Sequence, residues 1–284
     1  MGKRKKRVII AFANRAYAEE DGMLDIFVES FREGVDTEWL LPHLLLVAVD
    51  QTAFDRCNHH LLRGRIHCFK LVTEGVDFSG EQLFMSDAFI RMMWRRTLFL
   101  GDVLRRGYSF IFTDTDVMWL RNPFAQLGEE GDLQISCDRF NGRAWNTTNP
   151  INTGFYFARS SNKTISLFDM WYSERNNSVG MKEQDVLENM ISSGILEELG
   201  VKVRYLDTRY FGGFCQSSRN LGDVITMHAN CCQTISAKLI DLRTVLEDWK
   251  MLKASTSNTT LPFRWNQHNH CRMSWKIPVQ QNTT

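Results

Sequence analysis

Two aspartates one residue apart are the strongest chemical signal in the sequence. Asp114 and Asp116 follow an apolar run in SFIFTDTDVMWLRNPF, residues 109–124. Side chains at i and i+2 of an extended backbone point to the same side, so we expect the two carboxylates to converge at a strand end. Burying unpaired carboxylates is costly, and Arg121 is the cation closest in sequence. Mg²⁺ or Mn²⁺ would resolve this, because such an ion prefers oxygen ligands and leaves positions open for a diphosphate.

A second interpretation of the two aspartates stays open. They could be turn or helix-cap residues, one of them paired with an arginine. The apolar strand before them and WLRNPF after them favour the metal site.

The rest of the chain predicts strands that alternate with helices. Apolar runs bounded by turn residues predict strands at 6–14, 43–50, 67–72, 109–116, 132–138, 151–159, 201–207 and 224–230. Helical spacing of apolar residues predicts helices at 23–34, 51–62, 87–106, 163–175, 182–199 and 235–253. This order predicts an α/β fold with a mostly parallel central sheet flanked by helices. Ligands bind beyond the carboxyl ends of such strands, so Asn14, Asp50 and Asp207 become further candidates.

Composition sets broad limits on the function. The 284 residues are 43% hydrophobic and carry a formal net charge of +1, which gives a large core and no strong field for nucleic acid. No run approaches the roughly 20 apolar residues of a membrane span, and no signal peptide is apparent. We expect a basic tail over 1–6, one domain over 7–254 and a polar segment over 255–284. We expect this segment to be partly packed on the domain and only loosely attached, with a metal patch at His268, His270 and Cys271 as the less favoured alternative.

Cysteine and asparagine usage bears on the cellular compartment. The chain has seven cysteines, an odd number, and Cys57 and Cys68 could bridge if the surroundings are oxidising. Asn-x-Ser/Thr acceptor sites favour a secretory lumen and occur at Asn146, Asn162, Asn176, Asn258 and Asn282. Buried free thiols in a cytosolic protein remain the alternative.

Several separated motifs resemble one enzyme family. FTDTDVMWLRNP, TEGVDFSGEQLFMSDAFIRMMWRR, INTGFYFARS and KEQDVLENM are similar to motifs of the plant nucleotide-diphospho-sugar transferases of glycosyltransferase family 77. That family includes rhamnogalacturonan-II xylosyltransferases and cell-wall arabinosyltransferases. The resemblance covers about residues 7–275. It implies the Rossmann-like GT-A fold, Mn²⁺ or Mg²⁺, a UDP-sugar donor, a glycan or glycoprotein acceptor and retention of anomeric configuration. It also implies Golgi residence, usually with a membrane anchor, which this sequence does not show.

Residues near the first strands and the long helix are candidates for binding the nucleotide. Asn14 and Tyr17 would read or stack on uracil, and Asp50 would contact the base or ribose; an ordinary strand-to-helix loop is the alternative. Arg95 and its neighbour Arg96 lie on the helix before the aspartates. We expect Arg95 to hold the diphosphate or orient the aspartates, and a solvated basic face is the alternative.

Later motifs supply candidates for the sugar and the metal. In INTGFYF, the resemblance assigns Asn152 to the sugar hydroxyls, although a backbone bulge would explain it too. Asp185, and next Gln184, would face the anomeric carbon, whereas the helix dipole alone also favours acids there. By the same resemblance His228 would complete the metal site with Asp114 and Asp116, unless it is a structural histidine. YFGGF, residues 210–214, is expected to be a mobile loop. No nucleophile is assigned.

Two alternatives to an active glycosyltransferase stay open. A catalytically silent glycan-binding relative would keep the fold without turnover. A phosphohydrolase of the haloacid dehalogenase type also carries DxD after a strand. That signature has Thr or Val where Met118 stands and lies on the first strand, whereas here three strands precede it. The sequence therefore favours the glycosyltransferase.

Overall fold

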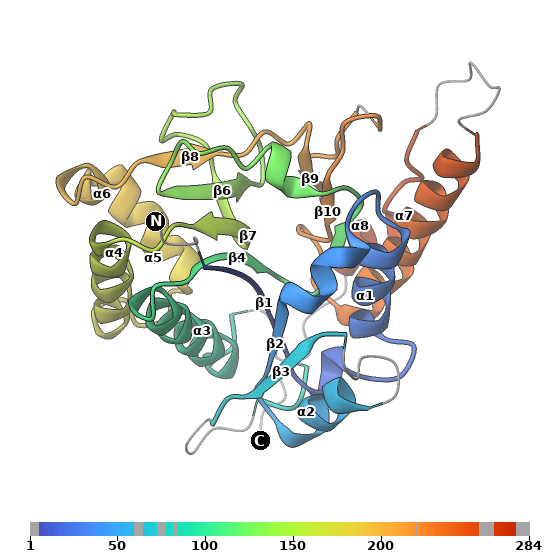
Figure 1. The fold of residues 1–284 in the computed structure, drawn as a ribbon, viewed down its shortest axis with the longest axis horizontal. Helices are drawn as coiled ribbons and strands as arrows, with labels where there is room; N and C mark the ends of the chain where they lie inside the picture. The colour runs from blue at the N-terminus through green and yellow to red at the C-terminus, as the bar shows by residue number, and fades with distance from the viewer. Residues whose placement is uncertain are drawn as a thin grey trace, which may run out of the picture.

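A seven-stranded sheet forms the centre of the molecule (Figure 1). The fold comes from a computed structural model that describes residues 6–59, 65–72, 78–81, 85–219, 221–255 and 264–276. The sheet has the order β3-β2-β1-β4-β7-β6-β8. Its strands are β1 (Arg7–Ala13), β2 (Leu44–Ala48), β3 (His67–Lys70), β4 (Ser109–Thr113), β6 (Leu133–Cys137), β7 (Ile151–Ala158) and β8 (Val203–Tyr205). Within it, β7 runs antiparallel to β4 and β6 and the other pairs are parallel, which confirms the predicted mostly parallel sheet.

Helices cover both faces of this sheet. They are α1 (Met23–Glu33), α2 (Gln51–Asn58), α3 (Asp87–Arg105), α4 (Asn162–Ser173), α5 (Glu183–Ser192), α6 (Ile195–Glu198), α7 (Ile235–Ser255) and α8 (Asn269–Ser274). Short 3₁₀ turns span Arg15–Tyr17, Glu38–His43, Pro123–Ala125 and Glu174–Asn176. The predicted helix over 182–199 is two helices, because Gly194 adopts a left-handed φ of 82° between them. The predicted helix over 51–62 ends at Asn58, and 60–62 lie outside the described residues.

Alternating strand residues divide the core into two layers. In β4, Ile111 packs in one apolar cluster with α1 and α7, whereas Phe110 and Phe112 pack in the other with α3, α4 and α5. Figure 1 shows these two groups of helices on opposite sides of the sheet. A strand buried on both faces is apolar at nearly every position, which explains the apolar run before the aspartates.

A second, three-stranded sheet lies beyond the carboxyl end of β4. It has the order β5-β10-β9, built from β5 (Val117–Trp119), β10 (Thr226–His228) and β9 (Phe211–Gly213). The expectation of a mobile loop over 210–214 is wrong, since β9 is a buried strand paired with β10. The sheet also brings residues far apart in sequence together, because His228 of β10 pairs with Val117 of β5.

Residues 264–276 are firmly fastened to the domain. A disulfide joins Cys271 to Cys232, and Trp275 Nε1 donates to the carbonyl of Cys231 over 2.7 Å. Asn266 bonds Asp248 through both its backbone and its amide. These residues are therefore packed on the domain, as expected in part, but they are not loosely attached. The disulfide removes Cys271 from the alternative metal patch.

The described cysteines form three disulfides. The anticipated Cys57–Cys68 bridge is confirmed, and Cys215–Cys231 and Cys232–Cys271 accompany it. Cys137 is the buried thiol left over from the odd number. Among the helices that the structure describes, none is both long enough and apolar enough to span a bilayer.

Candidate active site

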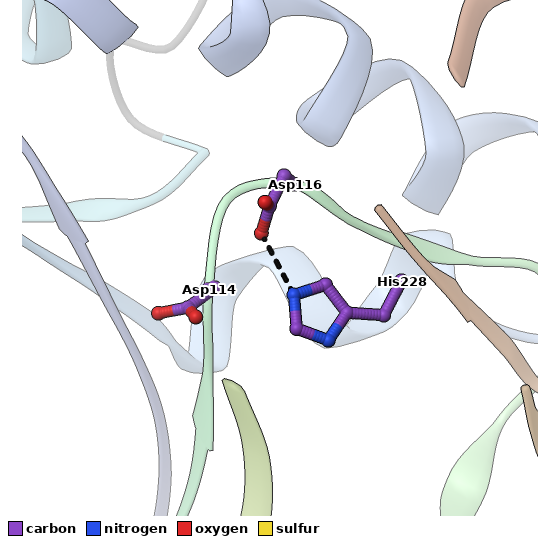
Figure 2. Close-up of side chains that lie close together, drawn as sticks. All are labelled: Asp114, Asp116 and His228. Atoms are coloured by element: carbon purple, nitrogen blue, oxygen red, sulfur yellow. Dashed lines mark ion pairs between the residues drawn. The ribbon is translucent and has the colours of Figure 1, made fainter. Parts of the chain in front are cut away.

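The two aspartates lie in a tight turn between β4 and β5. The Val117 amide donates to the carbonyl of Asp114 over 3.3 Å, so the extended backbone expected here is wrong. The side chains still gather, because the second sheet presents His228 to them. One ligand atom from each of Asp114, Asp116 and His228 lies within 4.8 Å of the others. Figure 2 shows Asp116 and His228 turned toward each other, with Asp114 at the end of its strand beside them.

Asp116 is the buried member of this cluster. Its Oδ2 accepts a hydrogen bond from Lys238 Nζ over 2.8 Å, and its Oδ1 lies 3.2 Å from His228 Nε2. Oδ1 nevertheless has no partner with hydrogen-bond geometry. Burial opposes ionisation of Asp116, but the positive charges of Lys238 and His228 outweigh burial and hold the pKa of this carboxyl well below its usual range. Asp116 is therefore an ionised, buried carboxylate whose Oδ1 makes no hydrogen bond and faces the imidazole of His228.

Asp114 is held by an arginine of α3. Arg96 Nη1 donates to Asp114 Oδ1 over 2.9 Å, and Arg96 Nη2 donates to the buried Glu183 over 2.6 Å. Burial raises the pKa of Asp114 to about 6, with Arg96 acting against this shift and Asp116 adding to it. The expectation that Arg95 rather than Arg96 orients the aspartates is wrong, since Arg95 is turned toward the carbonyl of Val72.

Arg121, the cation nearest to the aspartates in sequence, forms its hydrogen bonds elsewhere. Arg121 donates to the backbone carbonyls of Leu221 and Val224. The cations that contact the two aspartates are Arg96, 18 residues from Asp114 in the sequence, and Lys238, 122 residues from Asp116.

A glycine of β7 provides the space in which the cluster fits. A β-carbon at Gly154 would lie 2.3 Å from His228 Cε1 and 2.8 Å from Asp114 Oδ2. Both groups therefore face the bare Cα of Gly154 and occupy the volume that any side chain would take. The Gly154 carbonyl also accepts from the Asp114 amide over 2.7 Å, which fixes the turn against β7.

These residues fit a divalent cation. Each carboxylate has one oxygen committed to a protein cation, while Asp116 Oδ1 is buried without a hydrogen bond and Asp114 Oδ2 faces the same space as His228. Two carboxylate oxygens and an imidazole nitrogen form a donor set that suits Mn²⁺. A buried unsatisfied carboxylate oxygen is costly, and coordination would relieve that cost.

The cluster opens onto a cavity of about 310 Å³ where β1 and β4 end. The strand order reverses between these strands, as expected for an α/β ligand site. The predicted site residues that line it are Asn14, Tyr17, Asp114, Asp116, Asn152, Gln184 and His228. Asp50, Arg95, Asp185 and Asp207 do not line it.

The first-strand candidates mainly build the cavity wall. The Asn14 amide donates to the carbonyls of Phe78 and Gly80, and its Oδ1 accepts from the Tyr17 amide. Asn14 therefore holds a loop in place, and Tyr17 presents its side chain to the cavity. Asp50 caps α2 by accepting from the amides of Arg15 and Ala53, as the loop interpretation expects.

Among the candidates for contacting the sugar, Asn152 and Gln184 line the cavity and Asp185 does not. The Asn152 amide donates to Asp138, and its oxygen accepts from Gly154, so its position is fixed. Gln184 accepts from the amide of Thr153 and lines the cavity. Asp185 lies outside the lining, 3.7 Å from Lys182, so the geometry favours Gln184 over Asp185.

Sequence reasoning ranked Arg96 behind Arg95 and missed Lys238, yet helical spacing marks both Arg96 and Lys238. Arg96 lies four and eight residues before Leu100 and Leu104, on the buried stripe of α3. Lys238 lies four residues before Leu242 on the buried face of α7. A cation on an apolar helical stripe indicates a buried partner, and that signal was present in the sequence.

Comparisons with known proteins agree with this geometry. Residues 39–242 match the nucleotide-diphospho-sugar transferase family, and the chain belongs to that family. It is therefore a glycosyltransferase.

Two individual relatives and one solved structure are similar to this chain. The chain is 55% identical over 277 residues to the uncharacterized protein At1g28695 of Arabidopsis thaliana, covering 95% of this chain and 80% of that protein. It is 34% identical over 151 residues to the beta-arabinofuranosyltransferase RAY1 of Arabidopsis thaliana, covering 51% of this chain and 27% of that protein. The glycosyltransferase GlyE of Streptococcus pneumoniae matches with a TM-score of 0.50 at 11% identity, covering 90% of this chain and 66% of that one. That likeness shows the GT-A type of fold.

Proposed function

We propose that this protein is a metal-dependent glycosyltransferase that moves a sugar from a UDP-sugar to a glycan or glycoprotein. The observation that carries the proposal is the Asp114–Asp116–His228 cluster, which opens onto a cavity at the reversal of strand order. Mn²⁺ or Mg²⁺ is the proposed ion.

The chain's own residues prepare this site for a diphosphate. Asp114 Oδ2, Asp116 Oδ1 and His228 would hold the cation, which when bound neutralises the charge of the diphosphate. Arg96 and Lys238 hold the other oxygen of each aspartate, so the carboxylates are oriented before any ligand arrives.

Two polar side chains of the cavity lining would receive the sugar. They are Asn152 and Gln184, and each is fixed by a hydrogen bond to a neighbour. As the acceptor oxygen bonds to the anomeric carbon, the bond from that carbon to the diphosphate oxygen breaks. The diphosphate keeps the electron pair and takes up the proton that the acceptor hydroxyl loses. Retention of configuration is carried from the family resemblance alone.

Membership of glycosyltransferase family 77 is part of the proposal. The similarity to a beta-arabinofuranosyltransferase supports a pentose donor, and galactose is the other sugar proposed. A role in cell-wall polysaccharide or glycoprotein synthesis follows from the same likeness.

A Golgi lumen is the proposed compartment. Three disulfides support an oxidising lumen rather than the cytosol. The acceptor asparagines Asn162 and Asn176 are exposed, as glycosylation requires.

The test is a panel of UDP-sugars with and without Mn²⁺, with UDP release as the readout. We expect one sugar to release UDP with Mn²⁺ and none to do so in EDTA. Asp116→Asn should abolish this release, whereas Asp207→Asn, outside the cavity, should leave it unchanged. Glycan binding with no UDP release from any donor would indicate the silent relative, and hydrolysis of a simple phosphate ester would indicate a phosphohydrolase.

A further inference from the structure

A second cavity adjoins the first. It has a volume of about 980 Å³ and lies between residues 214–219 with Leu221 and the C-terminal segment 264–276. Cys231 and Trp275 line both cavities, so the two spaces meet at these residues. A group bound in the second cavity therefore lies beside the proposed donor site.

The charged residues that line this second cavity are positively charged. Arg219, Arg264 and Arg272 line it, and no aspartate or glutamate is among its described lining residues. This is a local feature, because the whole chain carries a net charge of only +1. Guanidinium groups suit carboxylates in particular, since their planar donors match both oxygens.

The carboxylates of the neighbouring helix are committed elsewhere. Asp241 accepts from His270 and from the amide of Cys271, and Asp248 accepts from Asn266. These bonds tie the C-terminal segment to α7, so the carboxylates hold the cavity wall in place.

Two indoles with fixed orientation complete the cavity. Trp275 Nε1 donates to the Cys231 carbonyl and Trp265 Nε1 donates to the Ser218 carbonyl. Trp275 nevertheless exposes 54% of its surface. With its polar edge satisfied, an indole offers an apolar face of the kind on which the C–H groups of a sugar ring can pack.

Disulfides make these walls rigid before any ligand binds. Cys215–Cys231 closes one wall, and Cys232–Cys271 attaches the helix that carries Arg272. A preorganised site loses less entropy on binding, so modest contacts suffice for specificity.

We propose that this second cavity binds an acidic glycan, with carboxylates of uronic acid residues on the arginines and a sugar ring on Trp275. The bound glycan is the acceptor, and the inference rests on the proposed function in that respect. Trp275 lies at the junction of the cavities, where an acceptor hydroxyl would meet the donor sugar. An acidic peptide would satisfy the arginines alone and would gain nothing from the indole faces.

Calorimetry on the intact protein tests this binding without turnover. The probes are a six-residue oligogalacturonate, its fully methyl-esterified form and hexaglutamate, each titrated with and without Mn²⁺ and UDP. We expect the acidic oligosaccharide to bind at least 10-fold more tightly than either other probe. The variant Arg264→Gln/Arg272→Gln should lose 10-fold to 100-fold in this affinity, whereas Arg106→Gln, at the residue that follows α3, should lose none.

Other outcomes would overturn the inference. Equal affinity for the acid and its methyl ester, tighter binding of hexaglutamate, or unchanged affinity in the double variant would each refute it. A Trp275→Leu variant that binds the acidic oligosaccharide unchanged would refute the stacking. UDP release without acceptor depends only on the first cavity, so its absence would refute the proposed function while leaving the glycan affinities to be judged separately.

Discussion

Replacing Gly154 by alanine should damage the metal site while leaving the fold intact. The new β-carbon would lie 2.3 Å from His228 Cε1, and ordinary contact begins at 3.4 Å, so the imidazole must move by about 1 Å. Gly154 lies in β7 with no left-handed φ, so the backbone accepts alanine. Overpacking of this kind costs about 1–3 kcal/mol of stability.

The effect on function should exceed the effect on stability. A misplacement of about 1 Å in a preorganised site costs on the order of 100-fold, so we expect Mn²⁺ affinity to fall by about that factor. Electron paramagnetic resonance of free Mn²⁺ measures this affinity, and circular dichroism follows the fold.

Gly101→Ala in α3 is the matched control. Its β-carbon would make an ordinary 3.4 Å contact with Phe168, so Mn²⁺ affinity should not change. If Gly154→Ala bound Mn²⁺ as tightly as the wild type, His228 and Asp114 would not be acting together as ligands.

Three further variants test other parts of the structure. Arg96→Met leaves the buried Glu183 without its cation, so the free energy of unfolding in urea should fall by about 3–5 kcal/mol. Adding Glu183→Gln should recover at least half of this loss. No recovery would show that Arg96 acts through packing alone. Burial lowers the pKa of His268 from its ordinary 6.5 to about 4. Between these pH values the unfolded chain binds more protons than the folded protein, so the stability falls as the pH drops through this range. Between pH 7 and pH 5 this loss should be about 1–2 kcal/mol, and His268→Phe should remove it from the pH profile; an unchanged profile would contradict the shift. Replacing Cys232 and Cys271 by serine opens a bridge over 39 residues and should cost about 2–4 kcal/mol, measured by thermal unfolding; an unchanged midpoint would mean that the segment docks without the bridge.

The main sheet and its helices could be predicted from local patterns. Apolar runs such as VIIAF and LLLVAV become β1 and β2, and each has a neighbour on both faces. Such runs are readable because burial on both faces demands apolar residues throughout. In the second sheet only β10 was readable, within the strand predicted at 224–230. β5 and β9 have three residues each, too few to show a pattern, and β10 lies far from its partner β5 in the sequence.

The site could be predicted in part for a related reason. Asp114 and Asp116 stand out because carboxylates rarely follow a buried strand. Their partners depend on tertiary contacts: Lys238 comes from α7 and His228 from β10. The choice between Arg95 and Arg96 was a question of helical phase, and the buried stripe of α3 resolves it in favour of Arg96.

The C-terminal segment shows the limit of composition as a guide. It is polar, and polar terminal segments are usually loose. Here a disulfide, two indole hydrogen bonds and the carboxylates of α7 fasten it, and none of these depends on apolar burial. Apart from the Cys57–Cys68 bridge, the pairing of the bridged cysteines could not be read from spacing, because several connectivities are compatible with it.

Anomalous diffraction from crystals grown with Mn²⁺ and UDP tests the central claim most directly. The account predicts one manganese peak bounded by Asp114, Asp116 and His228, beside the UDP diphosphate. UDP in the cavity with no manganese peak there, and both aspartates bonded only to Arg96 and Lys238, would contradict it.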